Sequence, residues 1–235
     1  MDIEKEGQAE GLPRGMGNQV SCEFNLLYRF HSAISEDDAN WTNDFFKSCL
    51  PSALQHKALE DLTPDDMHSM MNIFAEERSK EPQVREFGGL KRGSDGRFDD
   101  AQLANILQRK IDDPAGVFGA KQVPKVMKVV EMAAVVAARK WEVASLNEFR
   151  SFFGLEPHKT FESINKDKNI ANALRNLYDS PDMVEMYPGI FIEGVADESE
   201  GIRFPPTAGR GVLSDAVTLV RSDRFYTIVS GNPCI

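Results

Sequence analysis

Apolar residues recur along this chain at intervals of three and four positions, which is the spacing of an amphipathic α-helix. The clearest cases are "TPDDMHSMMNIFAEERSK", residues 63–80, and "FDDAQLANILQRKIDD", residues 98–113. Their apolar faces consist of Met67, Met70, Met71 and Phe74 in the first segment and of Leu103, Ile106, Leu107 and Ile111 in the second. No segment gives the alternating signal of a β-hairpin, so the pattern predicts an all-α fold.

Breaks in the pattern place further helices. The expected helices lie at about residues 18–35, 42–50, 63–80, 98–113, 124–140, 145–153 and 167–178, with a last one from about 211. Thr63 followed by Pro64 is a typical helix start, and Ser145 is a candidate N-cap. We expect "SEDDANW" to be the turn that closes the first helix. Four glycines predict a loop in "FGGLKRGSDGRF".

The chain has 235 residues, enough for one large domain or two small ones. Its 41% hydrophobic and 27% charged residues are ordinary for a soluble globular protein with a real core. We expect a loop-like segment at residues 1–17, followed by the helical part of the chain.

The charge balance disfavours a nucleic-acid partner. There are 27 basic and 37 acidic residues, a net charge of −10, and no basic stripe that could follow a phosphate backbone. The cysteines, Cys22, Cys49 and Cys234, are few and lack metal-site spacing, which argues against a disulfide scaffold or a zinc site. A reducing compartment fits this cysteine usage best.

Targeting signals are also missing from the sequence pattern. The acidic, glycine-rich start has no apolar core of the kind that a secretory signal needs. The most apolar stretch, "VVEMAAVVAARKW", is too short and too interrupted to span a bilayer, so a core helix is expected there. These features favour the cytoplasm or the periphery of membranes or lipid bodies over secretion.

The segment "EFNLLYRFHSAIS" carries the first candidate chemistry. Tyr28 and His31 are three positions apart in an otherwise apolar run, and on one buried helix their Cβ atoms would lie roughly 5–6 Å apart. Such a histidine is either a core residue with satisfied nitrogens or a ligand or acid/base group, and the spacing alone leaves both open. The other histidines, His56, His68 and His158, lie in polar contexts and are expected to be structural or solvated.

Four segments in order carry a family resemblance. "EFNLLYRFH" resembles the proximal-helix motif of the cyclooxygenase-like haem oxygenases, and is most similar to that of the fungal fatty acid dioxygenases, the linoleate diol synthase and psi-factor-producing oxygenase group. "LNEFRSFFGLEPHKTFESI" resembles the Asn-x-x-Arg segment of animal haem peroxidases. "LYDSPDMVEMYPGIFIEGV" and "GRGVLSDAVTLVRSDRFYT" resemble the Tyr-Pro-Gly stretch and the last common helix of the family.

The resemblance implies a cofactor, haem b, and roles for named residues. His31 would be the proximal iron ligand, and Tyr28 the radical that takes a hydrogen atom from a bis-allylic carbon, to which O2 then adds. Asn147 would fix the His31 ring by a hydrogen bond, with Tyr187 as the alternative. Asn147 could equally be an ordinary helix-start residue, and Tyr187 could simply pack.

Two further assignments concern the haem edge and the substrate. Arg150 would pair with a haem propionate, or would form an ordinary ion pair with Glu148 or Glu156. Three apolar residues near the motif would line a fatty acid channel or pack in the core; they are Phe24, Leu27 and Phe30. Phe30 stands where cyclooxygenases carry tryptophan, which favours simple dioxygenation over cyclisation.

The resemblance also bears on the extent of the chain. In the family the distal histidine and a calcium-binding segment precede the proximal helix, so the resemblance implies that residues 18–227 are a partial haem dioxygenase domain, its C-terminal part, which is inactive alone. Residues 228–235 depart from the family pattern and are expected to be a divergent tail. The complete enzyme would use an unsaturated fatty acid and O2, with a cytochrome P450-like domain and homo-oligomers as possible additions. Two other hypotheses stay open: a haem-free helical interaction module, and a haem peroxidase without fatty acid activity.

Overall fold

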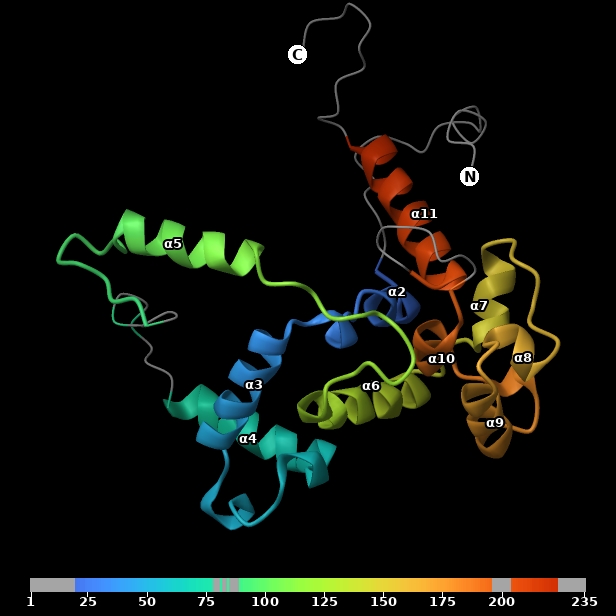
Figure 1. Ribbon diagram of the computed structural model, residues 1–235, viewed down its shortest axis with the longest axis horizontal. Helices are drawn as coiled ribbons and strands as arrows, with labels where there is room; N and C mark the ends of the chain where they lie inside the picture. Colours follow the sequence, from blue (N-terminus) through green and yellow to red (C-terminus); the bar gives the residue numbers. More distant parts are fainter. Residues whose placement is uncertain (1–19, 78–80, 82–83, 85–88, 196–203, 224–235) are drawn as a thin grey trace, which may run out of the picture. The chain divides into compact units, whose positions relative to one another are not determined.

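The computed structural model describes residues 20–77, 81, 84, 89–195 and 204–223. The expected loop at 1–17 and tail at 228–235 lie outside these ranges. Every multi-residue element of the described residues is an α-helix or a short 3-10 turn, and strand-like geometry is limited to isolated bridge residues, among them the pair Ser145 and Glu185 (Figure 1). The all-α prediction is confirmed.

The chain divides into two compact units. The first combines residues 1–29 with 138–235, and the second comprises residues 30–137. The boundary falls between Arg29 and Phe30, inside the segment that carries Tyr28 and His31.

The first unit is built from short helices that pack through small residues. Its helices are α2 (Cys22–Leu27), α7 (Leu146–Phe152), α8 (Phe161–Ile164), α9 (Lys168–Leu177), α10 (Met186–Ile192) and α11 (Pro206–Ser222). α7 begins at Ser145 with a capping box closed by Glu148, so the predicted start of this helix is confirmed. The backbone N–H of Leu146 donates to the carbonyl of Val184 over 2.8 Å and ties the beginning of α7 to the beginning of α10.

Glycines allow α10 and α11 to approach their neighbours closely. A Cβ atom on Gly189 would lie 3.0 Å from the Cβ atom of Leu146, and one on Gly211 would lie 2.9 Å from Cδ2 of Leu27. α10 therefore packs on α7, and α11 packs on α2. Pro206 sets the start of α11, five residues before the predicted start near 211.

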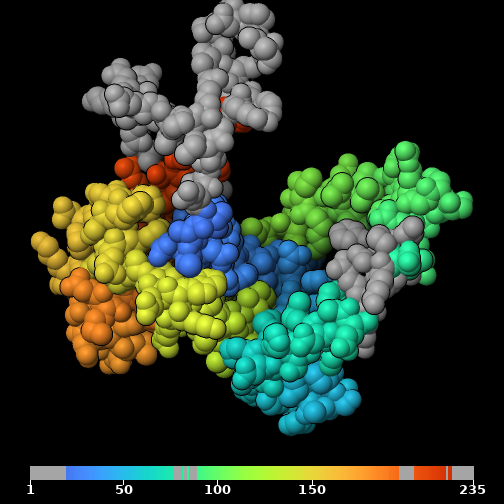
Figure 2. Space-filling model, turned by 180° about the vertical axis from the view of Figure 1, so that it is seen from behind, coloured from blue at the N-terminus to red at the C-terminus, as the bar shows by residue number. Residues whose placement is uncertain are grey.

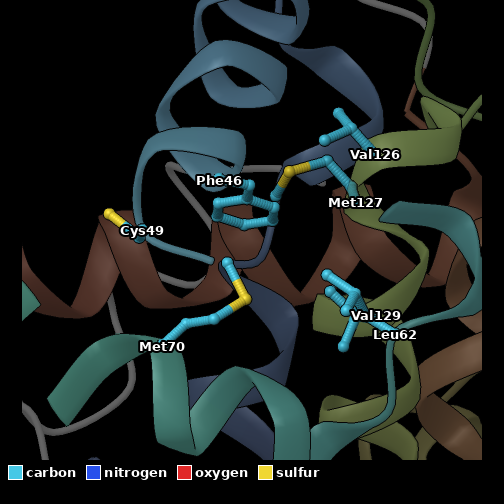
Figure 3. Close-up of a cluster of buried hydrophobic side chains, with 7 residues drawn as sticks. All are labelled: Phe46, Cys49, Leu62, Met70, Val126, Met127 and Val129. Atoms are coloured by element: carbon cyan, nitrogen blue, oxygen red, sulfur yellow. The ribbon is translucent and has the colours of Figure 1, made fainter. Parts of the chain in front are cut away.

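The second unit holds α3 (Glu36–Ser48), α4 (Pro64–Glu77), α5 (Asp100–Ile111) and most of α6 (Lys128–Lys140). Short 3-10 turns connect them at His31–Ala33, Ser52–Leu54, Leu59–Asp61 and Lys125–Met127. Its core consists of Phe46, Cys49, Leu62, Met70, Val126, Met127 and Val129 (Figure 3). As predicted, the Thr63 hydroxyl accepts the N–H of Asp66 at the start of α4.

One prediction for the second unit was wrong. "SEDDANW" does not form a closing turn, because Ser35 caps α3 and the acidic residues occupy its first turn, where carboxylates favour a helix start. α5 forms as predicted, but its apolar face is not covered: α5 has no buried residue, and Ile111 is 81% exposed. Part of this green helix is visible at the surface in Figure 2.

The expected helix over residues 18–35 is also interrupted. α2 ends at Leu27, and a separate 3-10 turn covers His31–Ala33. The reason is a tertiary contact, because Gly116 donates its N–H to the Ala33 carbonyl over 3.1 Å. A Cβ atom on Gly116 would lie within 2.8 Å of two carbonyl oxygens in residues 32–34, so this approach requires glycine.

A search of the described residues finds no helix with the length and apolar character needed to cross a membrane.

Candidate functional site

Tyr28 follows α2 directly and faces α11. Its hydroxyl donates a hydrogen bond of 2.5 Å to Oδ2 of Asp215. The Tyr28 ring lies 4.8 Å from the Phe24 ring, and the residue is 36% exposed, so it is less buried than the apolar sequence around it suggests. Partial burial, together with the hydrogen bond and the negative charge of Asp215, raises the pKa of Tyr28 to about 12.

Asp215 reaches Tyr28 because of its position on α11. Gly211 and Asp215 are four residues apart and therefore share a helix face, and Gly211 brings this face against Leu27 at the end of α2. Asp215 is only 8% exposed. Its second oxygen, Oδ1, is buried and accepts no hydrogen bond from the described residues.

His31 also has a carboxylate partner. Its Nδ1 lies 2.6 Å from Oε1 of Glu131, which α6 supplies. An ionised carboxylate can only accept, so a neutral His31 ring that bonds one has its proton on Nδ1 and its lone pair on Nε2. Nε2 makes no hydrogen bond to the described residues, and the side chain is 26% exposed. This is the arrangement of a metal-ligating histidine, whose other nitrogen usually donates to a carboxylate or carbonyl.

The residue that lies at Nδ1 of His31 is Glu131, and the predicted role of Asn147 or Tyr187 in holding the ring stays a prediction. The Asn147 amide instead donates to the His158 carbonyl over 2.9 Å and to Asp182 over 2.6 Å. Its oxygen accepts the His158 N–H, so the side chain fixes the loop after α7.

The prediction that Tyr28 and His31 lie on one face of the same helix is wrong. Tyr28 is the C-cap residue of α2, and Phe30 has a φ of −107° and a ψ of 36° before the turn that contains His31. Tyr28 belongs to the first unit and His31 to the second.

Arg150 binds a buried carboxylate of its own chain. Its Nη1 donates to Glu193 and, over 2.7 Å, to the Thr207 hydroxyl, while Nε donates to the Glu156 carbonyl over 2.9 Å. The pairing of Arg150 with a haem propionate stays a prediction, since here the guanidinium is bonded to groups of its own chain. The alternative, an ion pair of Arg150 with Glu148 or Glu156, is not found, because the acidic partner of Arg150 is Glu193.

Glu193 is the centre of this buried cluster. Burial alone would raise its pKa, but the hydrogen bonds from His158 and Thr207 and the charge of Arg150 outweigh burial and lower the pKa. The Thr207 N–H donates to Glu193 over 2.7 Å, so this carboxylate also satisfies the start of α11. His158 is mostly buried, 2.9 Å from Glu193, and so has the structural one of the two roles that were expected for it. A hollow of about 420 Å³ lies beside this cluster.

The remaining predicted residues are packed. Tyr187 is 1% exposed and contacts the Phe191 ring edge to face, with 5.2 Å between the ring centroids. Leu27 is buried against α11. In the second unit the ring centroids of Phe30 and Phe118 are 5.8 Å apart. Leu27 and Phe30 therefore pack against other side chains, which is one of the two roles expected for them. Their role in lining a fatty acid channel stays a prediction.

A second tyrosine provides a comparison for Tyr28. The Tyr178 hydroxyl donates to Glu185 over 2.8 Å, and burial raises the pKa of Tyr178 to about 12 together with that bond. Glu185 differs from Asp215, because Arg139 donates to both of its oxygens and lowers its pKa.

The sequence pattern missed the three acidic residues of these pairs, Glu131, Asp215 and Glu193. Each is separated from its partner by tens of residues or more, and nothing in the helical spacing distinguishes them among 37 acidic residues. One signal was available: Asp215 and Glu131 are charged residues within otherwise apolar helical stretches.

Comparison with known proteins places the chain in a family. Residues 16–234 match the sequence profile of the family described as "Animal haem peroxidase". The chain therefore belongs to the animal haem peroxidase family, and membership implies haem binding. The resemblance noted in the sequence is confirmed.

Curated relatives are fungal oxygenases. The chain is 47% identical to Linoleate 10R-lipoxygenase of Aspergillus fumigatus over 96% of this chain and 20% of that protein. It is 44% identical to Linoleate diol synthase of Gaeumannomyces graminis over 95% of this chain and 19% of that protein. It is 43% identical to Psi-producing oxygenase A of Emericella nidulans over 93% of this chain and 20% of that protein. The chain thus spans about a fifth of the length of these relatives.

Among solved structures, Peroxidase A from Dictyostelium discoideum aligns with a TM-score of 0.41 and 18% identity, over 57% of this chain and 31% of that one.

Proposed function

We propose that this chain is part of a haem-dependent fatty acid dioxygenase that converts a linoleate-type unsaturated fatty acid and O2 to a hydroperoxide through a tyrosyl radical. The observation that carries the proposal is the 47% identity, over 96% of the chain, to a protein named for linoleate oxygenation. Two other relatives at 43% and 44% identity are likewise named as a linoleate enzyme and an oxygenase.

The residues around His31 fit haem iron. The bond between His31 Nδ1 and Glu131 fixes the ring and leaves the Nε2 lone pair for a metal. Haem, as haem b, would supply the oxidising power, while the chain holds the ligand and orients it. In this proposal Glu131 is the partner that orients the His31 ring.

Tyr28 suits the role of radical residue by its place in the chain. Tyr28 and His31 are three positions apart in the chain, so their Cα atoms are at most roughly 11 Å apart whatever the arrangement of the two units. Partial exposure of Tyr28 leaves the phenol accessible to an apolar substrate. The product of hydrogen-atom transfer from a bis-allylic carbon is a carbon radical, to which O2 adds.

The test uses the complete dioxygenase of which we propose this chain to be a part, called the full-length protein below, loaded with haem and supplied with linoleate. We expect oxygen uptake and a linoleate hydroperoxide, and we expect His31→Ala to lose both activity and the absorbance of histidine-ligated haem. His158→Ala is the matched control, because His158 is bonded within the Glu193 cluster. Reduction of hydroperoxides without any oxygenation of linoleate would favour a haem peroxidase and contradict the proposal.

A further inference from the structure

The hydrogen bond between Tyr28 and Asp215 carries an inference that rests on the proposed function, in which Tyr28 is the radical residue. We propose that Asp215 is the proton acceptor of the Tyr28 phenol when Tyr28 is oxidised. The Tyr28 oxygen lies 2.5 Å from Asp215 Oδ2, within the range of a charge-assisted O–H···O⁻ bond. A base must be within hydrogen-bond reach of the proton that it takes, and Asp215 meets this condition.

The state of the phenol makes an acceptor necessary. With a pKa of about 12, Tyr28 is protonated at neutral pH, so its oxidation has to release a proton. A phenol that has lost an electron is a strong acid, and its proton moves to the nearest base at once. A base already in the hydrogen bond allows electron and proton to leave together and avoids a charged intermediate in a partly buried site.

The proposed step is balanced in atoms and charge. One electron leaves the phenol for a one-electron oxidant, which in the proposed function is the oxidised haem. The O–H bond of Tyr28 breaks, and the proton passes to Asp215 Oδ2. The products are a neutral tyrosyl radical and a protonated Asp215. A hydrogen atom taken from the fatty acid later restores the phenol without Asp215, so Asp215 acts when the radical is generated.

Asp215 is free to take this proton. Its Oδ1 is buried and accepts no hydrogen bond from the described residues, and no described cation pairs with its carboxylate. Its main interaction is therefore the one with Tyr28, and the low exposure of Asp215 keeps water from competing for the proton.

The carboxylate that accepts the hydrogen bond of Tyr178 is paired with a cation, unlike Asp215. Tyr178 donates to Glu185 in similar geometry, but Arg139 donates to Glu185 Oε1 over 2.6 Å and to Oε2 over 3.1 Å. An arginine that binds both oxygens favours the ionised carboxylate and makes Glu185 a weaker proton acceptor. The chain thus contains one tyrosine-carboxylate pair suited to proton transfer and one that is held by a cation.

The first test measures radical formation in the haem-loaded full-length protein. Hydroperoxide is added, the reaction is freeze-quenched, and the tyrosyl radical is followed by electron paramagnetic resonance, with Tyr28→Phe defining the signal of other tyrosines. We expect Asp215→Asn to slow the Tyr28 signal on the order of 10²-fold, as the loss of a general base does. Asp215→Glu should restore much of the rate, and Glu185→Gln should leave it unchanged.

A second readout separates proton acceptance from a structural role. In Asp215→Asn the rate should rise with the concentration of imidazole buffer at constant pH, because an external base must then take the proton. The wild-type rate should not depend on buffer concentration. A slow variant without this dependence would mean that Asp215 only positions the ring, and would overturn the proposal, as would an Asp215→Asn rate equal to wild type.

The two proposals can fail separately. Oxidation of Tyr28 by a flash-generated ruthenium(III) complex in the same protein does not require the haem reaction. If hydroperoxide produced no Tyr28 radical, the proposed function would be wrong, but base dependence in the flash experiment would still support Asp215 as acceptor. If Tyr28→Phe abolished oxygenation while Asp215→Asn oxidised Tyr28 at the wild-type rate, only the acceptor would be wrong.

Discussion

Tyr28 and His31 each bond a carboxylate that lies at least a hundred residues further along the chain. For His31, a carboxylate at Nδ1 increases the basicity of the ring and strengthens its donation through Nε2 to a metal. For Tyr28, the carboxylate holds the phenol in one orientation and raises its pKa. In the proposed function, single carboxylates would therefore select the His31 nitrogen that binds iron and the acceptor of the Tyr28 proton.

The partner of His31 leads to a prediction about haem ligation. In the haem-loaded full-length protein, Glu131→Ala should lower the iron-histidine stretching frequency and weaken haem binding on the order of 10–100-fold, because the ring loses its acceptor. Glu131→Gln should have a smaller effect. Resonance Raman spectroscopy and haem titration provide the measurements.

Asn147→Ala is the control for that prediction. Its amide is bonded to His158 and Asp182, so its loss should leave the iron-histidine frequency unchanged. A shift in Asn147→Ala together with a silent Glu131→Ala would contradict the assignment of Glu131.

Individual helices owe their positions to buried polar groups and to glycines. Glu193, at the end of α10, accepts hydrogen bonds from α11 and from His158 and pairs with Arg150 of α7. Gly211 sets the closest approach of α11 to α2 and so brings Asp215 to Tyr28.

The Glu193 cluster predicts a stability change upon mutation. Glu193→Ala should reduce the free energy of unfolding by about 3–5 kcal/mol, because it leaves the buried Arg150 guanidinium without its counter-charge. The double variant Arg150→Met with Glu193→Leu should recover most of that loss. Chemical denaturation of the full-length protein measures both, and an unaffected Glu193→Ala would show that the pair contributes little.

The same cluster predicts the response to acid. The pKa of Glu193 is lower in the folded state than its usual value, so its contribution is complete above that usual value and is lost as the pH falls through the folded-state pKa. Unfolding measured from pH 6 downwards should show a smaller loss of stability in Glu193→Gln than in wild type. Equal slopes in the two proteins would contradict the lowered pKa.

The contact between α2 and α11 predicts a packing effect. Gly211→Val should destabilise the protein by about 1–3 kcal/mol, because the new side chain meets the buried Leu27. In Gly209→Ala the new Cβ would lie 3.6 Å from Phe204, an ordinary contact, and the higher helix propensity of alanine should make this variant neutral or more stable. Thermal unfolding distinguishes the pair, and equal effects would mean that α11 does not approach α2 closely.

At the scale of the whole molecule, the helical pattern predicted most elements and their caps. Periodicity and local signals were sufficient for α4, α6, α7 and α9, since the Ser145 capping box and the Thr63 cap depend on neighbouring residues alone. The break after α2 could not be predicted, because it depends on a contact from Gly116, far along the chain. For the same reason the sequence indicated Tyr28 and His31 but not Asp215 or Glu131.

The exposed apolar surface predicts how the chain of 235 residues behaves by itself. Large apolar residues are open on several helices, among them Ile111, Phe152 and Leu177 at 81%, 81% and 75% exposure. Surfaces of this kind favour association or require a covering partner. Expressed alone, the chain should be poorly soluble and should bind a hydrophobic dye. A monodisperse sample with a sharp calorimetric transition would contradict this expectation.

The central claim is that Tyr28 is the radical residue of a haem dioxygenase. Oxygen uptake with linoleate, measured for Tyr28→Phe in the full-length protein at matched haem concentration, tests it most directly, with Tyr178→Phe as the matched control. The account predicts that Tyr28→Phe keeps its haem spectrum and its hydroperoxide reduction but loses oxygen uptake, while Tyr178→Phe retains all three. Oxygen uptake by Tyr28→Phe at close to the wild-type rate would contradict it.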